Sequence, residues 1–180
     1  MDKIELEKIQ NIIGYSFRNT KLLEQAFCRN SFSNFHGGEN NEVLEFYGDK
    51  ILSLAVIKDF YDLKGGFNSG GEFISARSVS RLNREYCSLV KNSHLAERIS
   101  RLCLFKHLKV AGKIEKSSMK ARADLFEAIL GAVALDSDWN LQTISKVFHR
   151  MMFSNIVPKT ESFTRGKGLL RYILSKYKAA

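Results

Sequence analysis

Two apolar segments of the sequence each carry a row of carboxylates, and this combination most restricts the possible fold. In residues 40–56, NNEVLEFYGDKILSLAV, the acids Glu42, Glu45 and Asp49 are spaced three and four residues apart. Such spacing places side chains on one face of an α-helix. The surrounding apolar residues predict that the rest of this helix is buried. The row of acids must therefore face water, a cation or a ligand.

The second segment, ADLFEAILGAVALDS at 123–137, repeats this arrangement with Asp124 and Glu127. Each segment also has a glycine beside its acids, Gly48 in the first and Gly131 in the second. A glycine inside a helix costs about 1 kcal/mol relative to alanine. Its presence indicates that two backbones approach closely at that point. If the two helices cross at their glycines, the carboxylates of both segments meet.

Carboxylates gathered in an apolar setting repel one another and raise one another's pKa unless a cation neutralises them. Mg²⁺ takes oxygen ligands, retains several waters and bridges to phosphate. Two acidic rows, each beside a glycine, favour such a metal site over exposed acids that merely share a face. The candidate ligands are Glu45, Asp49, Asp124 and Glu127.

The composition predicts one helical domain. The chain has 180 residues, 44 % of them hydrophobic, and a single proline, Pro158. This is enough for one core, and long stretches without turn signals predict an all-α helical bundle. Helices are expected over 4–12, from Asn19 or Thr20 onward, over 42–63 with Asn40 or Asn41 as its cap, and over 74–102 with a break near Lys91 and Asn92. Loops are expected over 33–41, 64–73 and 109–120.

Several classes of protein are excluded by the same sequence. No apolar run approaches 18 residues and nothing resembles a signal peptide, so a cytoplasmic protein that does not enter the membrane is expected. Cys28, Cys87 and Cys103 lie far apart without a CxxC pair, which argues against a zinc site or a disulfide framework. They are interpreted as core thiols.

Positive charge is concentrated in residues 73–122, the basic segment. It holds 12 Lys and Arg but 3 Asp and Glu, a surplus equal to the net charge of +9 of the whole chain. A surplus this large favours a polyanionic partner over a solvated helix face. Arg77, Arg81 and Arg84 are the candidates for phosphate contacts.

Residues 41–52, NEVLEFYGDKIL, closely resemble the signature helix of the ribonuclease III family, and ADLFEAILGAVALDS resembles that family's second motif. Two further stretches, YSFRNTKLLEQAFCRNSF and SLVKNSHLAERI, resemble its N-terminal region and its middle helix. The resemblance covers residues 10–155 with the motifs in the family's order. On these motifs the sequence is identified as a member of that family.

The resemblance implies an all-helical endonuclease domain that forms a symmetric homodimer. It implies cleavage of double-stranded RNA with Mg²⁺, for which Mn²⁺ substitutes, to 5′-phosphate and 3′-hydroxyl ends. The four carboxylates match the catalytic metal ligands, Glu42 an acid at the RNA-binding rim, and Phe46 the aromatic that enters the partner subunit. The alternative is a non-catalytic scaffold that binds RNA or dimerises inside a ribonucleoprotein. Such members usually lack one or more of the acids, whereas this sequence has all four.

The sequence departs from the family pattern at several positions. Cys28 and Arg29 stand where the family has threonine and histidine, so part of the dimer interface is expected to differ. Lys50 replaces a small serine and is interpreted as a surface or interface residue. The stretch from Glu72 to Leu89 is longer than usual by about seven residues, near two helical turns.

The domain boundaries expected from these motifs are 1–158 for the nuclease domain and 159–180 for a basic tail. Within the tail, KGLLRYILSKY resembles the first helix of a double-stranded-RNA-binding domain. Alternatively, the tail is a basic helix that packs on its own domain, or a flexible end.

Overall fold

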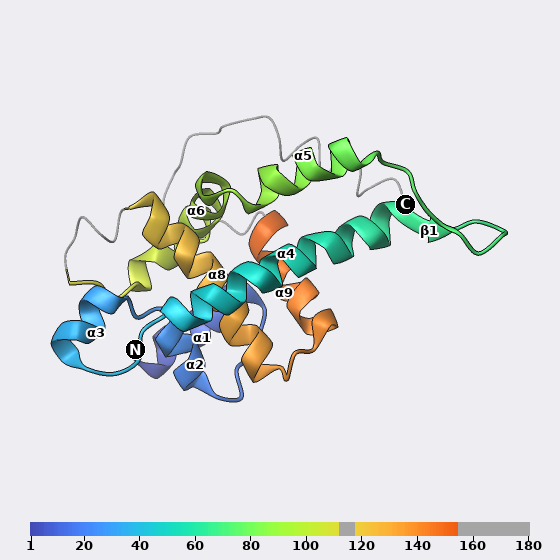
Figure 1. The fold of residues 1–180 in the computed structure, drawn as a ribbon. Coiled ribbons are helices and arrows are strands. Elements are labelled where there is room, and N and C mark those ends of the chain that lie inside the picture. The colour runs from blue at the N-terminus through green and yellow to red at the C-terminus, as the bar shows by residue number, and fades with distance from the viewer. Residues whose placement is uncertain (112–117, 155–180) are drawn as a thin grey trace.

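The computed structural model describes residues 1–111 and 118–154, and this part of the chain is mostly helical, as the sequence predicts (Figure 1). Its strands form a single short hairpin. The elements in chain order are α1 (Lys3–Ile13), α2 (Thr20–Ala26), α3 (Asn30–His36), α4 (Glu42–Lys64), β1 (Gly65–Phe67), β2 (Phe73–Ser75), α5 (Val79–Val90), α6 (Asn92–Arg101), η1 (Leu104–His107), α8 (Met119–Asp136) and α9 (Leu141–Phe153).

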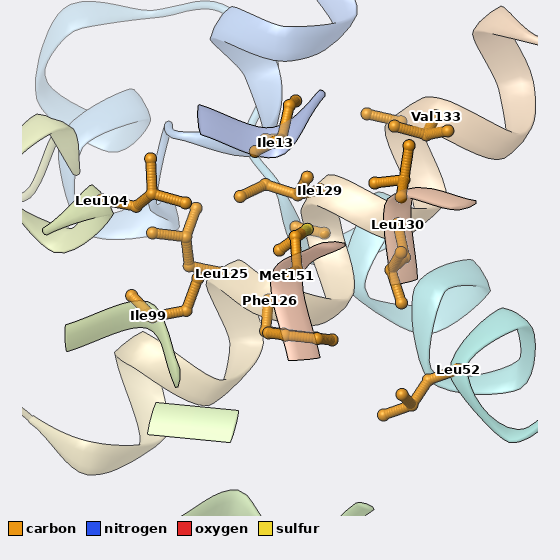
Figure 2. Packing of buried hydrophobic residues seen from close by; sticks show 14 of the residues in the cluster. Ile13, Leu52, Ile99, Leu104, Leu125, Phe126, Ile129, Leu130, Val133 and Met151 are labelled. Atoms are coloured by element: carbon orange, nitrogen blue, oxygen red, sulfur yellow. The ribbon is translucent and has the colours of Figure 1, made fainter. Parts of the chain in front are cut away.

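Helix α8 lies at the centre of the fold. It is buried on nearly every side and packs against α4, α6, α2 and α9. A helix that is apolar all round must be enclosed by other elements, and each large side chain buried there contributes roughly 1.5–3 kcal/mol. Figure 2 shows side chains of the surrounding elements meeting those of α8. The labelled residues are Ile13, Leu52, Ile99, Leu104, Leu125, Phe126, Ile129, Leu130, Val133 and Met151.

Helices α4 and α8 cross with their backbones in contact, which confirms the interpretation of the two glycines. A β-carbon at Gly48 would lie 1.8 Å from the carbonyl oxygen of Glu127. A β-carbon at Gly131 would lie 2.1 Å from the carbonyl oxygen of Leu44. No residue other than glycine fits at either position, so the acids of the two helices are brought together by the packing of the core.

Polar side chains determine where the helices begin. The Oδ1 atom of Asn19 accepts a hydrogen bond from the Lys21 amide at 3.2 Å, which makes Asn19 the cap of α2. The N-cap residue of α4 is Asn41, and the Oδ1 atom of the preceding Asn40 accepts from the Glu42 amide at 2.9 Å. The hydroxyl of Ser118 accepts from the Ala121 amide at 3.0 Å and starts α8. Each cap satisfies an amide that has no partner inside its helix.

Two predicted loops are in fact partly ordered as regular structure. Residues 33–36, expected in a loop, form the end of α3. The glycine-rich stretch after α4 forms the β1–β2 hairpin, in which Phe67 is paired with Phe73. Its turn uses Gly71 with a φ of +81°, a conformation that glycine adopts without strain. As a result α5 begins at Val79 rather than at residue 74, whereas the break at Lys91 between α5 and α6 is confirmed.

The remaining predictions concern the cysteines, the basic loop, the tail and the absence of a membrane span. Cys28 is buried, but Cys87 is exposed on α5, so the interpretation of all three cysteines as core thiols is wrong for Cys87. Residues 112–117 of the predicted basic loop and the predicted tail 159–180 lie outside the described residues. Within the described part, none of the helices is both long and apolar enough to span a bilayer.

Candidate metal centre

Three of the predicted carboxylates lie together where α4 and α8 cross. One oxygen of Glu45, one of Asp124 and one of Glu127 all lie within 4.8 Å of one another. We call these three residues the carboxylate cluster. Asp124 is buried, and the other two are partly buried. Asp124 and Glu127 are three residues apart on α8 and so share one face, and Gly48 allows α4 to approach that face. The cluster is therefore a direct consequence of the helix crossing.

Asp49, the fourth predicted ligand, lies beside the cluster rather than within it. Its Oδ2 atom is 2.6 Å from the ammonium nitrogen of Lys50, and its side chain is about half exposed. Its negative charge nevertheless acts on Glu127, whose pKa it helps to raise. The structure therefore brings three of the four predicted acids into one group and leaves Asp49 paired with Lys50 at its edge.

The electrostatics of the cluster show that its negative charge is not fully neutralised. Burial, followed by the charges of Asp49, Glu45 and Asp124, raises the pKa of Glu127 to about 7. Burial and the charge of Asp124 also raise the pKa of Glu45, partly opposed by the cations Lys120 and Arg29. Within the described residues, Glu127 makes no hydrogen bond or salt bridge. Its carboxylate is therefore available to a cation.

Two cations contact the other members of the cluster. The ammonium nitrogen of Lys120 lies 2.9 Å from each carboxylate oxygen of Asp124 and 3.4 Å from Oε1 of Glu45. The Nη1 atom of Arg29 lies 2.7 Å from Oδ2 of Asp124 and 3.9 Å from Oε2 of Glu45. Sequence reasoning missed both contacts. The spacing of Lys120 four residues before Asp124 was a usable signal, whereas Arg29 is 95 residues away from Asp124.

The residues present fit a hard divalent cation. The donor set consists of carboxylate oxygens alone, which Mg²⁺, Mn²⁺ and Ca²⁺ accept and softer metals do not prefer. No histidine or cysteine belongs to the group found among the described residues. A bound divalent ion would relieve the repulsion that raises the pKa of Glu127.

The other predicted site residues surround this centre. Glu42 is exposed at the start of α4 and accepts a hydrogen bond from Nδ2 of Asn30 at 2.9 Å. Phe46 is 64 % exposed on α4, although phenylalanine is usually buried. The ammonium of Lys50 lies 5.9 Å from the centroid of the Phe46 ring. The surface next to the carboxylates is thus partly apolar.

Of the predicted phosphate-binding arginines, Arg77 precedes α5, Arg81 lies in its first turn and Arg84 lies near its middle. Arg81 and Arg84 are exposed, and Arg77 is partly buried. Both Arg77 and Arg81 form salt bridges with Glu85, the one from Arg81 with an Nε to Oε1 distance of 3.0 Å. One acid therefore offsets part of the positive charge of this group.

Comparison with known proteins supports one family. A family model described as Ribonuclease-III-like matches residues 19–156. The chain is 38 % identical over 169 residues to Ribonuclease 3 of Roseburia hominis, which covers 84 % of this chain and 47 % of that protein. It is 31 % identical over 186 residues to Ribonuclease 3 of Buchnera aphidicola subsp. Cinara cedri, covering 98 % of this chain and 74 % of that protein.

The same family appears among solved structures. The nuclease domain of ribonuclease III from Campylobacter jejuni superposes with a TM-score of 0.68 at 25 % identity, covering 89 % of this chain and all of that domain. The chain spans less than half the length of the Ribonuclease 3 proteins of Roseburia hominis and Treponema succinifaciens. With the family model matching most of its length, the chain belongs to the ribonuclease III family.

Proposed function

We propose that this chain is the nuclease domain of an endoribonuclease that uses Mg²⁺ to hydrolyse double-stranded RNA to 5′-phosphate and 3′-hydroxyl ends. The observation that carries the proposal is the carboxylate cluster, in which three acids converge and Glu127 makes no salt bridge among the described residues. Family membership supplies the reaction class. Residues 1–158 are proposed as the nuclease domain, in keeping with the family match over 19–156.

The residues act as follows in this proposal. Glu45, Asp124 and Glu127 hold the metal, and Asp49 lies close enough to contribute its charge. When bound, a divalent ion lowers the pKa of the attacking water and offsets charge on the phosphate. Because the cluster is partly buried, its negative charge is poorly screened by solvent and attracts the ion strongly. Glu127 must lose its proton before it serves as a ligand.

The RNA and the second subunit are assigned to different surfaces. Arg77, Arg81 and Arg84 are proposed to contact phosphates of the duplex, and Glu42 is proposed to lie at the RNA-binding rim. Contacts of this kind read the A-form shape rather than the base sequence. The exposed ring of Phe46 is proposed to enter a pocket on a two-fold related copy of the chain, since isologous interfaces bury the same patch on both subunits.

The test is cleavage of a long RNA duplex by the purified chain in Mg²⁺, in Mn²⁺ and with a chelator. The variant E127Q should lose at least about a hundredfold in cleavage rate, because it removes a ligand charge but keeps the shape of the side chain. Its folding and duplex binding should stay intact. The matched control is E7Q, which removes one exposed acid on α1, far along the chain from the cluster.

The alternative proposal, a non-catalytic scaffold, gives a different result in the same assay. Undiminished cutting by E127Q would show that the carboxylate cluster is not the catalytic site. Duplex binding without metal-dependent cutting by the wild-type chain would favour the scaffold instead. The presence of Glu45, Asp49, Asp124 and Glu127 together favours the enzyme.

A further inference from the structure

We propose that Arg29 is a built-in counter-cation of the carboxylate cluster, which holds Asp124 and Glu45 in the metal-free protein and competes with the metal for them. Arg29 is then a positioning residue that sets how tightly the centre binds a divalent ion. This inference rests on the proposed function, because it assumes that the cluster is the metal site.

The contact between Arg29 and Asp124 is short and shielded from water. The distance from Nη1 to Oδ2 is 2.7 Å, and the two side chains are only 17 % and 4 % exposed. Charge-assisted hydrogen bonds of this length are about twice as strong as neutral ones, and burial protects them from screening. Lys120 also contacts Asp124, at 2.9 Å, but its side chain is 67 % exposed, so solvent weakens this interaction more.

The backbone around Arg29 is fixed, so the guanidinium is aimed at the cluster by the fold. The Arg29 amide donates a hydrogen bond to the carbonyl of Lys109 at 3.0 Å. The carbonyl of the preceding residue, Cys28, accepts from the Asn41 amide at 2.8 Å, next to the start of α4. Arg29 also occupies the N-cap position of α3. These bonds tie it to two segments distant in sequence, one of which leads directly into the helix that carries Glu45.

A metal ion and these cations compete for the same oxygens. Oδ2 of Asp124 accepts from Arg29, while Lys120 contacts both oxygens of that carboxylate. A divalent ion that takes either oxygen must displace or repel a positive charge. Glu127 makes no hydrogen bond or salt bridge among the described residues, so its carboxylate can bind the ion without displacing a cation. Removal of Arg29 should therefore tighten metal binding and, without metal, destabilise the fold.

These two effects have opposite signs, which distinguishes competition from a structural role. A residue that only stabilises the fold would, when removed, weaken both the fold and the metal site. Arginine stays protonated throughout the accessible pH range, so its competition cannot be switched off by pH. The variant R29H, which places the family's histidine here, carries an imidazole that can lose its charge, whereas the guanidinium cannot.

The experiment measures Mn²⁺ binding by calorimetry at pH 8, and thermal unfolding in EDTA, for the full chain. R29Q should bind Mn²⁺ roughly tenfold more tightly than wild type, a change of about 1.4 kcal/mol. It should also unfold at a lower temperature in EDTA and gain more from added Mn²⁺. R29H should resemble R29Q, and R29K should bind with an affinity between those of R29Q and wild type. K120Q should show a smaller effect, and R101Q, which removes an exposed charge paired with Glu97, should show none.

The outcomes separate this inference from the proposed function. If wild type binds Mn²⁺ and E127Q does not, but R29Q and R29H bind no more tightly than wild type, the competition is refuted and the metal site stands. If neither wild type nor R29Q binds Mn²⁺ or cuts RNA, the metal-dependent function itself fails, and the inference with it. Should R29Q fail to fold, the comparison of R29H and R29K with wild type decides the same question.

Discussion

The α-carbon of Gly48 lies so close to the backbone carbonyl of Glu127 that a β-carbon there would stand 1.8 Å from the oxygen. Gly48, which allows the two helices to approach each other, is therefore in contact with Glu127, whose carboxylate completes the cluster. The position of Glu127 relative to Glu45 is therefore set by main-chain packing and not by the flexibility of side chains.

Substitution G48A should destabilise the protein by roughly 3 kcal/mol, because the obstructing atom is backbone and cannot move aside as a side chain does. Thermal unfolding followed by circular dichroism measures the loss. The control is G66A in β1, where a β-carbon would meet nothing within 4 Å. Equal stability of G48A and G66A would contradict the helix contact.

Stability without metal should depend on pH through Glu127. Its pKa of about 7 lies above the usual value of 4.5, so the folded state holds this proton more tightly than the unfolded state does. The resulting stability is fully present below about pH 4.5 and is lost as the pH rises through 7. In EDTA, the melting temperature of wild type should fall relative to that of E127Q between pH 5 and 8. The control E7Q should follow wild type, and parallel curves for all three would refute the shift.

Substitution F46A should convert a dimer into a monomer. Burying a ring that is 64 % exposed in one copy supplies roughly 1.5–3 kcal/mol of apolar transfer per subunit. Sedimentation at micromolar concentration measures the change. The control F35A removes another exposed ring, on α3, and should leave the dimer intact. A wild-type monomer in this experiment would contradict the proposed assembly.

Joint substitution of Arg77, Arg81 and Arg84 by alanine should weaken duplex binding and flatten its salt dependence. Each arginine that binds a phosphate should account for roughly 0.7 to 0.9 of the slope of log affinity against log salt. Fluorescence anisotropy at several salt concentrations measures the slope. Because Glu85 pairs with Arg77 and Arg81, E85Q should have the opposite effect and tighten binding. Slopes unaffected by either change would place the RNA on another surface.

Substitution R98M should destabilise the fold by about 2–4 kcal/mol. Arg98 is fully buried, donates from Nε to the carbonyl of Met151 at 2.9 Å and from Nη2 to that of Ser154 at 2.7 Å, and so holds the end of α9. Loss of the guanidinium leaves two carbonyls without these donors, and each such loss costs about 1–3 kcal/mol. Urea unfolding measures the change. R101A, which removes an exposed base of the same helix, should cost less than about 1 kcal/mol.

Sequence periodicity was sufficient to predict the helices and their central crossing, because apolar spacing and glycine position are local signals. It was insufficient to predict contacts between residues far apart in the sequence, or which charged side chains are buried. Arg29 reaches Asp124 from a backbone that is hydrogen-bonded to Lys109, and no local pattern encodes either contact. Arg98 was counted in the basic segment, yet its side chain is buried, since composition does not distinguish an enclosed base from an exposed one.

The hairpin was missed for a related reason. Glycines around Phe67 and Phe73 argue against a strand when each residue is considered alone. In the structure the two rings lie edge to face, with centroids 5.8 Å apart, and Tyr61 of α4 stacks on Phe73. The contact between strands, rather than the preference of either one, stabilises this element.

The β1–β2 hairpin also has a practical use. It lies beyond the last turn of α4, at the opposite end of the molecule from α3 (Figure 1). Because Gly65 pairs with Ser75, the two sides of its turn are held next to each other. An inserted protein whose own termini are adjacent could therefore be accommodated between residues 69 and 70, since exposed turns tolerate such insertions best. A fluorescent reporter or an affinity handle placed there would leave the carboxylate cluster untouched.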